Sequence, residues 1–358
     1  MHVHVCVLGA GGLGSVIGAR LAESGVHVSL VARPAHVAAI RDHGLRVEGI
    51  SGARTVRDNL SAFESIDDVP GHIDWLVVLV KTRDTNAAVD SAVPHTDRIG
   101  TAFSLQNSVT KDRLLAERLG AANIIGASTT EAGVLVAPGT VRHTATAPTA
   151  FYFGEQPADW TFGSMPGHAP ARPVANGGTS KRVDELVEVF TNAGLAAQAT
   201  DRIEQVEWEK LLQISAVAGF CASTLGFMPD ASFGPALAVR SGAEHYVQLV
   251  TELLAVYQAL GYEPQDFYAP FATFRRAATL SFDEAVADAM ALGSTMVAKG
   301  VGGRPSLHED LLRHRPTELD DCIGEYLRAA DRLGVPTPTL RGAHRVISTL
   351  ELLTKDAT

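Results

Sequence analysis

The chain has 358 residues, a formal net charge of −10 at pH 7 and a hydrophobic content of 46%. This length favours two domains over one and allows a large buried core. The acidic balance argues against nucleic acid as a partner, because nucleic-acid binding needs concentrated Lys and Arg, and no uninterrupted apolar stretch is long enough to span a bilayer.

The number and spacing of the cysteines and histidines indicate the cellular compartment and whether a metal site is expected. The three cysteines, Cys6, Cys221 and Cys322, are odd in number and far apart, which is typical of a reduced cytoplasmic protein. The amino terminus has no charged leader of a secretory signal, so we expect a cytoplasmic location. The 13 histidines form neither an HExxH motif nor a cluster with metal-ligand spacing, so we expect no metal site.

Residues 3–31 predict a strand, a glycine-rich turn, a helix and a second strand. In this context a GxGxxG motif indicates a dinucleotide-binding turn; the alternative is a structural turn that binds nothing. Gly9 permits the tight turn, Gly11 lets the backbone approach a pyrophosphate, and Gly14 brings the helix close to the strand. The helix N-terminus also favours an anion. The predicted cofactor-binding residues here are Gly9, Ala10, Gly11, Gly12, Leu13 and Gly14.

Arg33 follows the second strand, at the position that selects between the two nicotinamide dinucleotides. Enzymes that prefer NAD usually place Asp or Glu there, to bind the ribose 2′-hydroxyl. A guanidinium can instead make a two-pronged contact with a 2′-phosphate. We therefore expect NADP(H) as cofactor, the alternative being that Arg33 is a solvated surface cation.

Two further strands, over 75–80 and 101–105, are apolar at nearly every position, as expected of parallel strands covered on both faces. The first ends in Lys81 and the second is followed by Gln106 and Asn107. Ligands of open α/β sheets bind beyond the carboxyl ends of the strands. We therefore expect Lys81 and Asn107 to contact cofactor or substrate, although either alone could be an ordinary surface residue.

The other elements of this part are weaker predictions. The hairpin over 134–143 and the strand over 150–154 are expected to extend the parallel sheet. The Pro- and Gly-rich segment 156–180 is expected to be a flexible insertion. The remaining predictions are helices over 34–44 and 181–193 and strands over 45–50, 54–56, 123–127 and 196–200.

From residue 203 onward apolar residues recur at helical spacing, which places a domain boundary near residue 202. We therefore predict an α/β domain over 1–202 and an all-α domain over 203–358. Trp208 and Lys210 lie about 200° apart on a helix wheel, so they cannot share one buried face. Ser306 and the pair Thr317-Glu318 have the spacing of helix starts, so Ser306 and Glu318 can be read simply as capping residues.

The whole chain resembles the ketopantoate reductase (2-dehydropantoate 2-reductase) family. The matching segments occur in family order: Gly9-Ala-Gly-Gly-Leu-Gly14, the strand ending in Lys81, Leu105-Gln-Asn107, Trp208-Glu-Lys210-Leu, Pro305-Ser306 and Pro316-Thr-Glu318-Leu-Asp320. The resemblance implies an N-terminal Rossmann domain, and a helical domain like that of 6-phosphogluconate dehydrogenase for substrate binding and dimerisation. It also implies an interdomain cleft for NADPH and a 2-keto acid, and a homodimer.

The resemblance also implies roles for individual residues. Lys210 would be the general acid that protonates the keto oxygen, and Glu318 would bind substrate and hold the lysine. Asn107 would lie near the nicotinamide ribose and the substrate, Lys81 along the cofactor, and Ser306 near the substrate carboxylate.

Three positions depart from the family pattern. The family places asparagines one and two turns after its lysine, where this chain has Ile214 and Ala218, and a glycine where it has Ser108. Ile214 would make the substrate pocket less polar. We therefore expect reduction of a 2-keto acid or related carbonyl, with a substrate more apolar than ketopantoate favoured and ketopantoate itself left as an open reading. The alternatives are a hydroxy-acid or imine dehydrogenase on the same scaffold, and a non-catalytic NADP(H)-binding sensor.

Overall fold

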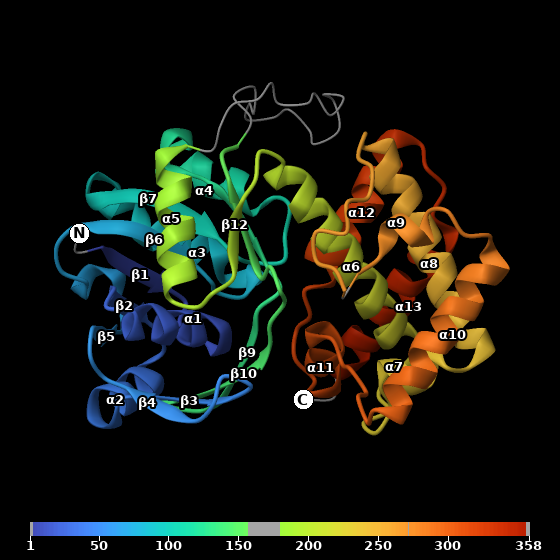
Figure 1. The fold of residues 1–358 in the computed structure, drawn as a ribbon, viewed down its shortest axis with the longest axis horizontal. Helices are drawn as coiled ribbons and strands as arrows, with labels where there is room; N and C mark the ends of the chain where they lie inside the picture. Colours follow the sequence, from blue (N-terminus) through green and yellow to red (C-terminus); the bar gives the residue numbers. More distant parts are fainter. Residues whose placement is uncertain (1–2, 157–179, 271, 356–358) are drawn as a thin grey trace. The chain divides into compact units, whose positions relative to one another are not determined.

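The computed structural model describes residues 3–156, 180–270 and 272–355, and the chain divides into two compact units (Figure 1). Among the described residues, the α/β unit contains 3–106, 110–156 and 180–207, and the helical unit contains 107–109 and the rest from 208 onward. The division falls inside one helix, α6 (Ile203–Leu225), between Glu207 and Trp208. The sequence placed the boundary near residue 202, just before this helix.

A five-stranded parallel sheet forms the centre of the α/β unit (Figure 1). Its order is β5-β2-β1-β6-β7, the arrangement of a Rossmann fold. On β1, Val5 and Val7 join the apolar cluster on one face of the sheet, and Cys6 and Leu8 join the cluster on the other. The strands are β1 (His4–Leu8), β2 (His27–Val31), β5 (Leu60–Phe63), β6 (Ile73–Val78) and β7 (Ile99–Ser104).

The structure confirms the predicted α/β class, and the sequence analysis missed only β5 of this sheet, a short strand after a turn. The helices predicted over 34–44 and 181–193 begin and end close to their predicted bounds, with Pro34 in the first turn of the former, whereas the helices over 85–92 and 111–119 were not predicted. The helices of the unit are α1 (Gly12–Glu23), α2 (Pro34–His43), α3 (Thr85–Ala92), α4 (Lys111–Leu119) and α5 (Lys181–Asn192).

The expectation that the later strands extend the parallel sheet is wrong. β10 pairs in parallel with β3 and antiparallel with β9, giving a separate sheet of order β4-β3-β10-β9. A third sheet has the order β12-β11-β8. The physical reason is that the β3–β4 hairpin leaves a free edge, which β10 covers. The strands are β3 (Leu45–Gly49), β4 (Arg54–Val56), β8 (Gly126–Thr129), β9 (Ala132–Ala137), β10 (Thr140–Ala145), β11 (Phe151–Gly154) and β12 (Ala197–Ala199). Most of the predicted insertion lies outside the described residues.

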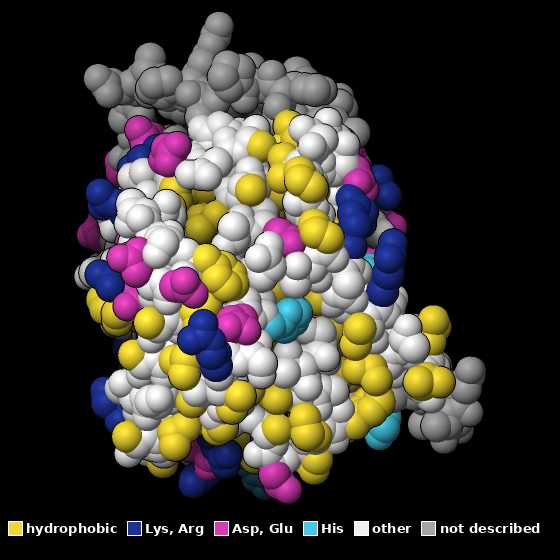
Figure 2. Space-filling view, turned by 90° about the vertical axis from the view of Figure 1, so that its right-hand side faces the viewer, with side chains coloured by type: hydrophobic (Ala, Val, Ile, Leu, Met, Phe, Trp, Pro, Cys, Tyr) yellow, Lys and Arg dark blue, Asp and Glu magenta, His cyan; other side chains and the backbone are white. Residues whose placement is uncertain are grey.

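The helical unit packs around a core that contains Trp208, Tyr257 and Tyr326, all fully buried. Figure 2 looks onto this unit and shows apolar side chains in patches between charged ones. No helix in the described ranges is long and apolar enough to cross a membrane. Besides α6, the helices are α7 (Phe233–Leu237), α8 (Arg240–Ala259), α9 (Phe274–Ala277), α10 (Phe282–Ala298), α11 (Ser306–Leu312), α12 (Leu319–Leu333) and α13 (Pro338–Lys355).

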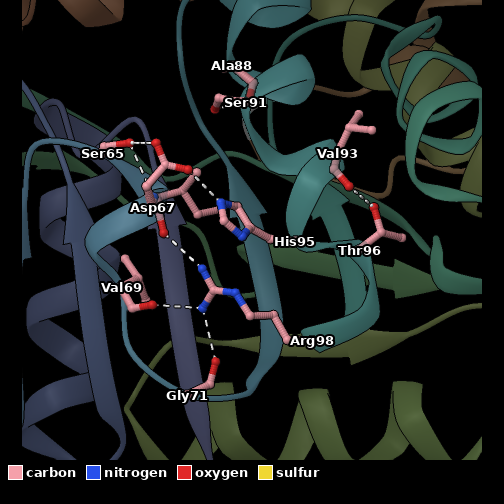
Figure 3. Close-up of polar contacts among 11 residues, drawn as sticks. Ser65, Asp67, Val69, Gly71, Ala88, Ser91, Val93, His95, Thr96 and Arg98 are labelled. Carbon is pink, nitrogen blue, oxygen red and sulfur yellow. Dashed lines mark hydrogen bonds and ion pairs between the residues drawn. The ribbon is translucent and has the colours of Figure 1, made fainter.

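A polar network joins the segments that precede β6 and β7 (Figure 3). The Arg98 guanidinium donates to the carbonyl oxygens of Val69 at 2.8 Å and Ile66 at 2.9 Å, and His95 Nε2 lies 2.7 Å from Asp67 Oδ1. The histidine bond holds the pKa of Asp67 below its ordinary value. Because this network lies at the amino ends of the strands, opposite the ligand-binding edge, its role is structural.

Candidate functional site

In the glycine turn between β1 and α1, two of the glycines lie so close to neighbouring backbone atoms that a side chain would not fit. Gly9 has φ +100°, and a Cβ there would lie 2.5 Å from the Val80 nitrogen. A Cβ at Gly14 would lie 2.9 Å from the Gly9 carbonyl oxygen. A Cβ at Gly11, in contrast, would meet nothing within 4 Å. The turn therefore needs glycine at Gly9 and Gly14 for its own packing, whereas Gly11 faces open space.

The N-terminus of α1 supplies backbone donors beside this open space. The Ser15 N–H donates to the Gly11 carbonyl oxygen, so the N–H groups of Gly12, Leu13 and Gly14 precede the hydrogen-bond ladder of the helix. Such donors, together with the helix dipole, suit a phosphate. A pyrophosphate over Gly11 therefore fits the turn.

A buried histidine, His36, which the sequence analysis did not identify, stabilises the glycine turn through hydrogen bonds. His36 Nδ1 accepts a hydrogen bond from the Gly139 N–H at 2.8 Å, so its Nε2 carries the proton and donates to Ser15 Oγ at 3.0 Å. The Ser15 hydroxyl in turn donates to the Ala10 carbonyl oxygen at 3.1 Å. Burial lowers the pKa of His36, which favours this neutral tautomer.

Arg33 and Lys81 are both exposed in the α/β unit. Arg33 lies two residues after β2, and its side chain makes no capping hydrogen bond to α2. Lys81 lies three residues after β6. Both cations thus follow the carboxyl ends of strands that flank β1 in the sheet.

Gln106 ties the carboxyl ends of β6 and β7 together. Its Nε2 donates to the Val80 carbonyl oxygen and to Thr85 Oγ1, both at 2.7 Å, and its Oε1 accepts from Ser104 Oγ at 2.9 Å. This amide is therefore fully used in holding the chain. The next residue, Asn107, is the first that the contacts assign to the helical unit.

Lys210 lies in the helical unit on α6, and its neighbour Trp208 packs edge-on against Tyr326 with ring centroids 5.2 Å apart. Lys210 is half-buried, with its Nζ 5.6 Å from the centroid of the Tyr268 ring. Burial lowers the pKa of Lys210 to about 8, and the charge of Cys322 acts in the opposite direction. An amine in this range is charged at neutral pH and gives up its proton more readily than an ordinary lysine.

Asn107 and Lys210 both lie around Cys322 of α12. The Cys322 thiol is directed to the Asn107 carbonyl oxygen at 4.0 Å, and its charge acts on Lys210. The structure therefore brings together, within the helical unit, two of the predicted site residues that are far apart in the sequence. Cys322, which the sequence analysis used only to infer a reducing compartment, contacts Asn107 and acts electrostatically on Lys210.

Neither Ser306 nor Glu318 caps a helix with its side chain. The N-cap of α11 is Pro305, and Ser306 is exposed in the first turn. The N-cap of α12 is Glu318 itself, half-buried and without a capping hydrogen bond, and Thr317 Oγ1 donates to Glu351 at 2.8 Å instead. The capping interpretation of these positions is therefore wrong.

The two positions where the family pattern has asparagines are both apolar in structure. Ile214 is half-buried and packs against the core of the helical unit, and Ala218 is fully buried within it. Ser215 between them is also fully buried, and its hydroxyl has no hydrogen-bond partner in the described part of the chain. The helix face that follows Lys210 is thus mainly apolar.

Two residues next to the lysine were given no role in the sequence analysis. Tyr268 lies in the irregular segment between α8 and α9, where no periodic pattern could reveal it. Glu209 accepts backbone hydrogen bonds from the same segment. Within the ranges that the structure describes, no group of three or more His, Cys, Asp or Glu side chains could hold a metal ion.

Comparison with known proteins gives matches over both units. The family model described as "Ketopantoate reductase PanE/ApbA" matches residues 5–158, and that of its C-terminal domain matches residues 202–351. A 2-dehydropantoate 2-reductase of Mesorhizobium japonicum is 26% identical, with 94% of each chain covered. Another, of Pyrococcus horikoshii, is 30% identical over 60% of this chain and 61% of its own length.

Solved structures share the fold over nearly the whole chain. A ketopantoate reductase of Ralstonia eutropha aligns with a TM-score of 0.74 and 24% identity, covering 99% of this chain and all of the other. The ternary structure of a D-mandelate dehydrogenase with NADH and anilino(oxo)acetate aligns with a TM-score of 0.74 and 18% identity, with the same coverage. At these identities the likeness establishes the fold.

Proposed function

Because the chain belongs to the ketopantoate reductase family, we propose that it reduces a 2-keto acid with NADPH and that Lys210 is the general acid. The family makes the chain an oxidoreductase. The observation that carries the proposal is the state of Lys210, whose half-buried amine has a pKa of about 8. Such an amine is mostly protonated at neutral pH and close to the range in which proton transfer is efficient.

The proton balance of the reaction defines what Lys210 must do. A bound reduced nicotinamide supplies a hydride to the carbonyl carbon. The C=O electron pair then moves to oxygen, and Lys210 Nζ gives that oxygen its proton. The ammonium also stabilises the negative charge that develops on oxygen before the proton moves. Bulk water then reprotonates the neutral amine.

For the cofactor, the α/β unit offers a turn with space over Gly11, free first-turn amides on α1, and the exposed Arg33 after β2. These features support a dinucleotide pyrophosphate at the turn. A guanidinium in place of the usual carboxylate supports NADP(H) over NAD(H). In this proposal Lys81 lies along the cofactor and Asn107 near the nicotinamide ribose.

Ser306 and Glu318 are proposed as substrate contacts. Support comes from their positions at the starts of α11 and α12, where Ser306 is exposed and Glu318 is half-buried. Ile214 is proposed to line the pocket for the substrate side chain. Because Ile214 and Ala218 offer no hydrogen bonds, we infer that the preferred substrate has an apolar side chain rather than the hydroxyl of ketopantoate.

A second candidate is oxidation of a 2-hydroxy acid. Its support is the D-mandelate dehydrogenase structure, in which a chain of this fold holds NADH and an aryl-substituted 2-oxo acid derivative. With Lys210 neutral at alkaline pH, the same amine would accept the hydroxyl proton.

Cofactor consumption with a panel of 2-keto acids tests the proposal. We expect NADPH oxidation with apolar 2-keto acids and slower turnover of ketopantoate. Lys210→Ala should lower turnover roughly 10²- to 10⁴-fold while leaving NADPH affinity unchanged. Equal loss of turnover and affinity would contradict the general-acid role, and tight NADPH binding without turnover of any carbonyl or alcohol would favour a sensor.

Homodimer formation is a further part of the proposal. Several large apolar residues of the helical unit are exposed: Val239, Phe282, Leu292, Val297 and Val301. Exposed apolar surface of this kind is compatible with an interface between copies. Light scattering after size-exclusion chromatography measures the assembly, and a monomer at micromolar concentration would refute it.

A further inference from the structure

We propose that Tyr268 and Glu209 are positioning residues for Lys210: Glu209 fixes the segment that carries Tyr268, and the Tyr268 ring holds the Lys210 ammonium over its face. The inference rests on the proposed function for what the lysine does. It adds two residues to the site: Tyr268 matches no motif in the sequence, and Glu209 lies within the Trp208-Glu-Lys210-Leu segment but has no role assigned there.

The first step is the contact between amine and ring. Lys210 Nζ lies 5.6 Å from the Tyr268 ring centroid, within the distance of about 6 Å at which the negative face of an aromatic ring attracts a cation. Tyr268 is only 2% exposed, so packing fixes its orientation. Such a contact is stronger where water is excluded.

The second step is the anchor of the ring. Glu209, also only 2% exposed, accepts hydrogen bonds from the Gln265 N–H at 2.8 Å, the Phe267 N–H at 3.0 Å and the Tyr257 hydroxyl at 3.1 Å. All three partners donate, which suits the ionised carboxylate. Two of the bonds hold the backbone immediately before Tyr268.

The third step joins the two contacts. Glu209 and Lys210 are neighbours on α6, so their side chains leave the helix about 100° apart. The carboxylate holds the segment 265–267, and this segment carries the ring of Tyr268 to the amine. The same turn of α6 therefore carries the amine, on Lys210, and the carboxylate that holds the segment of Tyr268, on Glu209. Glu209 acts on Lys210 through this segment.

The charges around the amine are few. Burial lowers the pKa of Lys210, and Cys322 on α12 is the titratable group in the described residues whose charge raises it. The Glu209 carboxylate is directed to the backbone of segment 265–267. The Tyr268 ring favours the ammonium and so acts against burial, keeping the amine protonated for its role as an acid.

The test weakens the negative potential on the face of the ring at position 268 while keeping the shape of the ring nearly constant. Phenylalanine and its mono-, di- and trifluorinated analogues are placed at Tyr268, and the Lys210 pKa is read by NMR of protein labelled with ¹³C-lysine, with Lys210→Arg to assign the signal. We expect Tyr268→Phe to resemble the wild type and successive fluorines to lower the pKa by about half to one unit in total. A pKa that does not change along the series would overturn the proposal.

The control is the same series at Tyr262, a neighbouring tyrosine whose ring packs against Tyr257 at 5.4 Å between centroids. Fluorination there should leave the Lys210 pKa unchanged. An equal shift at Tyr262 would show a general disturbance rather than a contact of ring and amine, and would contradict the role of Tyr268.

The role of Glu209 has its own pair of variants. Glu209→Gln replaces an acceptor oxygen by a donor that faces a backbone N–H, so it should release the segment and lower the Lys210 pKa. In a protein that carries both Glu209→Gln and trifluorophenylalanine at position 268, the shift in the Lys210 pKa should be smaller than the sum of the two separate shifts. Tyr257→Phe removes only the hydroxyl donor and should leave the Lys210 pKa unchanged; additive shifts in the combined variant would refute the linkage.

These readouts do not require turnover. If no carbonyl is reduced, the proposed function fails while the NMR titration still decides whether Tyr268 holds the amine. If the enzyme is active, the pH above which kcat of reduction falls should decrease along the fluorinated series in parallel with the Lys210 pKa. Falling kcat without this shift in pH would contradict a positioning role through the amine.

Discussion

Lys111 Nζ contacts the Glu207 carboxyl in the interior of the α/β unit, where both residues are less than 10% exposed. Asp112 lies 3.1 Å from the same amine, and its other oxygen accepts from Gln156 Nε2 at 2.6 Å. The Lys111 ammonium is thus the shared ion-pair partner of two buried carboxyl groups. Burial and the neighbouring charge of Asp112 raise the pKa of Glu207 well above its ordinary value.

Removing the cation of this cluster should be costly. Burial opposes the charge of Lys111, but the Asp112 and Glu207 charges hold its pKa above the ordinary value. Lys111→Met leaves these two groups without a cation, so we expect a loss of about 3–5 kcal/mol in the free energy of unfolding. Denaturant titration measures it. Lys181→Met, at a side chain that is 91% exposed, is the control and should change stability by less than about 0.5 kcal/mol.

The raised pKa of Glu207 also makes stability depend on pH. Between the unfolded pKa and the higher folded pKa, the folded protein binds more protons than the unfolded chain, so this contribution is present at low pH and is lost as pH rises. Glu207→Gln keeps the shape and removes the titration. As pH rises from about 5, the free energy of unfolding of this variant should therefore increase relative to that of the wild type. Parallel pH curves for the two proteins would contradict the assignment.

The glycine turn offers a matched pair of substitutions. Gly9→Ala should destabilise the fold, because φ is +100° and the new methyl group would lie 2.5 Å from the Val80 nitrogen. Gly11→Ala has open space around the methyl group and should leave the thermal midpoint nearly unchanged. It should nevertheless weaken NADPH binding, since the methyl group would stand where the pyrophosphate approaches. Calorimetry measures both quantities; unchanged affinity in Gly11→Ala would exclude a cofactor over this turn.

Arg33 should decide between the two cofactors. Arg33→Ala removes the proposed contact with the 2′-phosphate, a charged interaction of about 1.5–3 kcal/mol, so KM for NADPH should rise roughly 10- to 100-fold. KM for NADH should stay the same, because NADH lacks that phosphate. Steady-state kinetics with each cofactor makes the comparison. If both KM values rise equally, Arg33 does not read the phosphate.

The Lys210 amine should give the reaction a characteristic pH profile. Carbonyl reduction needs the ammonium, so kcat should fall as pH rises through about 8. Alcohol oxidation needs the neutral amine, so it should rise over the same range. Measuring both directions between pH 6 and 10 checks the opposite signs. A pH-independent reduction across this interval would indicate that another group supplies the proton.

Residues that act with their sequence neighbours could be predicted from the sequence. The turn from Gly9 to Gly14, the buried strand β1 and the start of α2 at Pro34 follow from steric and helix-end rules that operate over a few residues. The helix wheel indicated only that Trp208 and Lys210 face different sides of one helix, and the role of Lys210 came from the family resemblance. The carboxyl-end positions of Lys81 and Asn107 follow from parallel strand direction.

Only the tertiary structure decided which distant segments meet. β10 pairs with β3, about ninety residues earlier, because that edge was free, and no local pattern encodes such a choice. The same is true of Tyr268, whose ring lies near the Lys210 amine although the two residues are far apart in the sequence, and of the backbone just before Tyr268, which donates hydrogen bonds to Glu209. A sequence specifies local conformation through sterics and periodicity, whereas the surroundings of a side chain depend on contacts that form once the whole unit has packed.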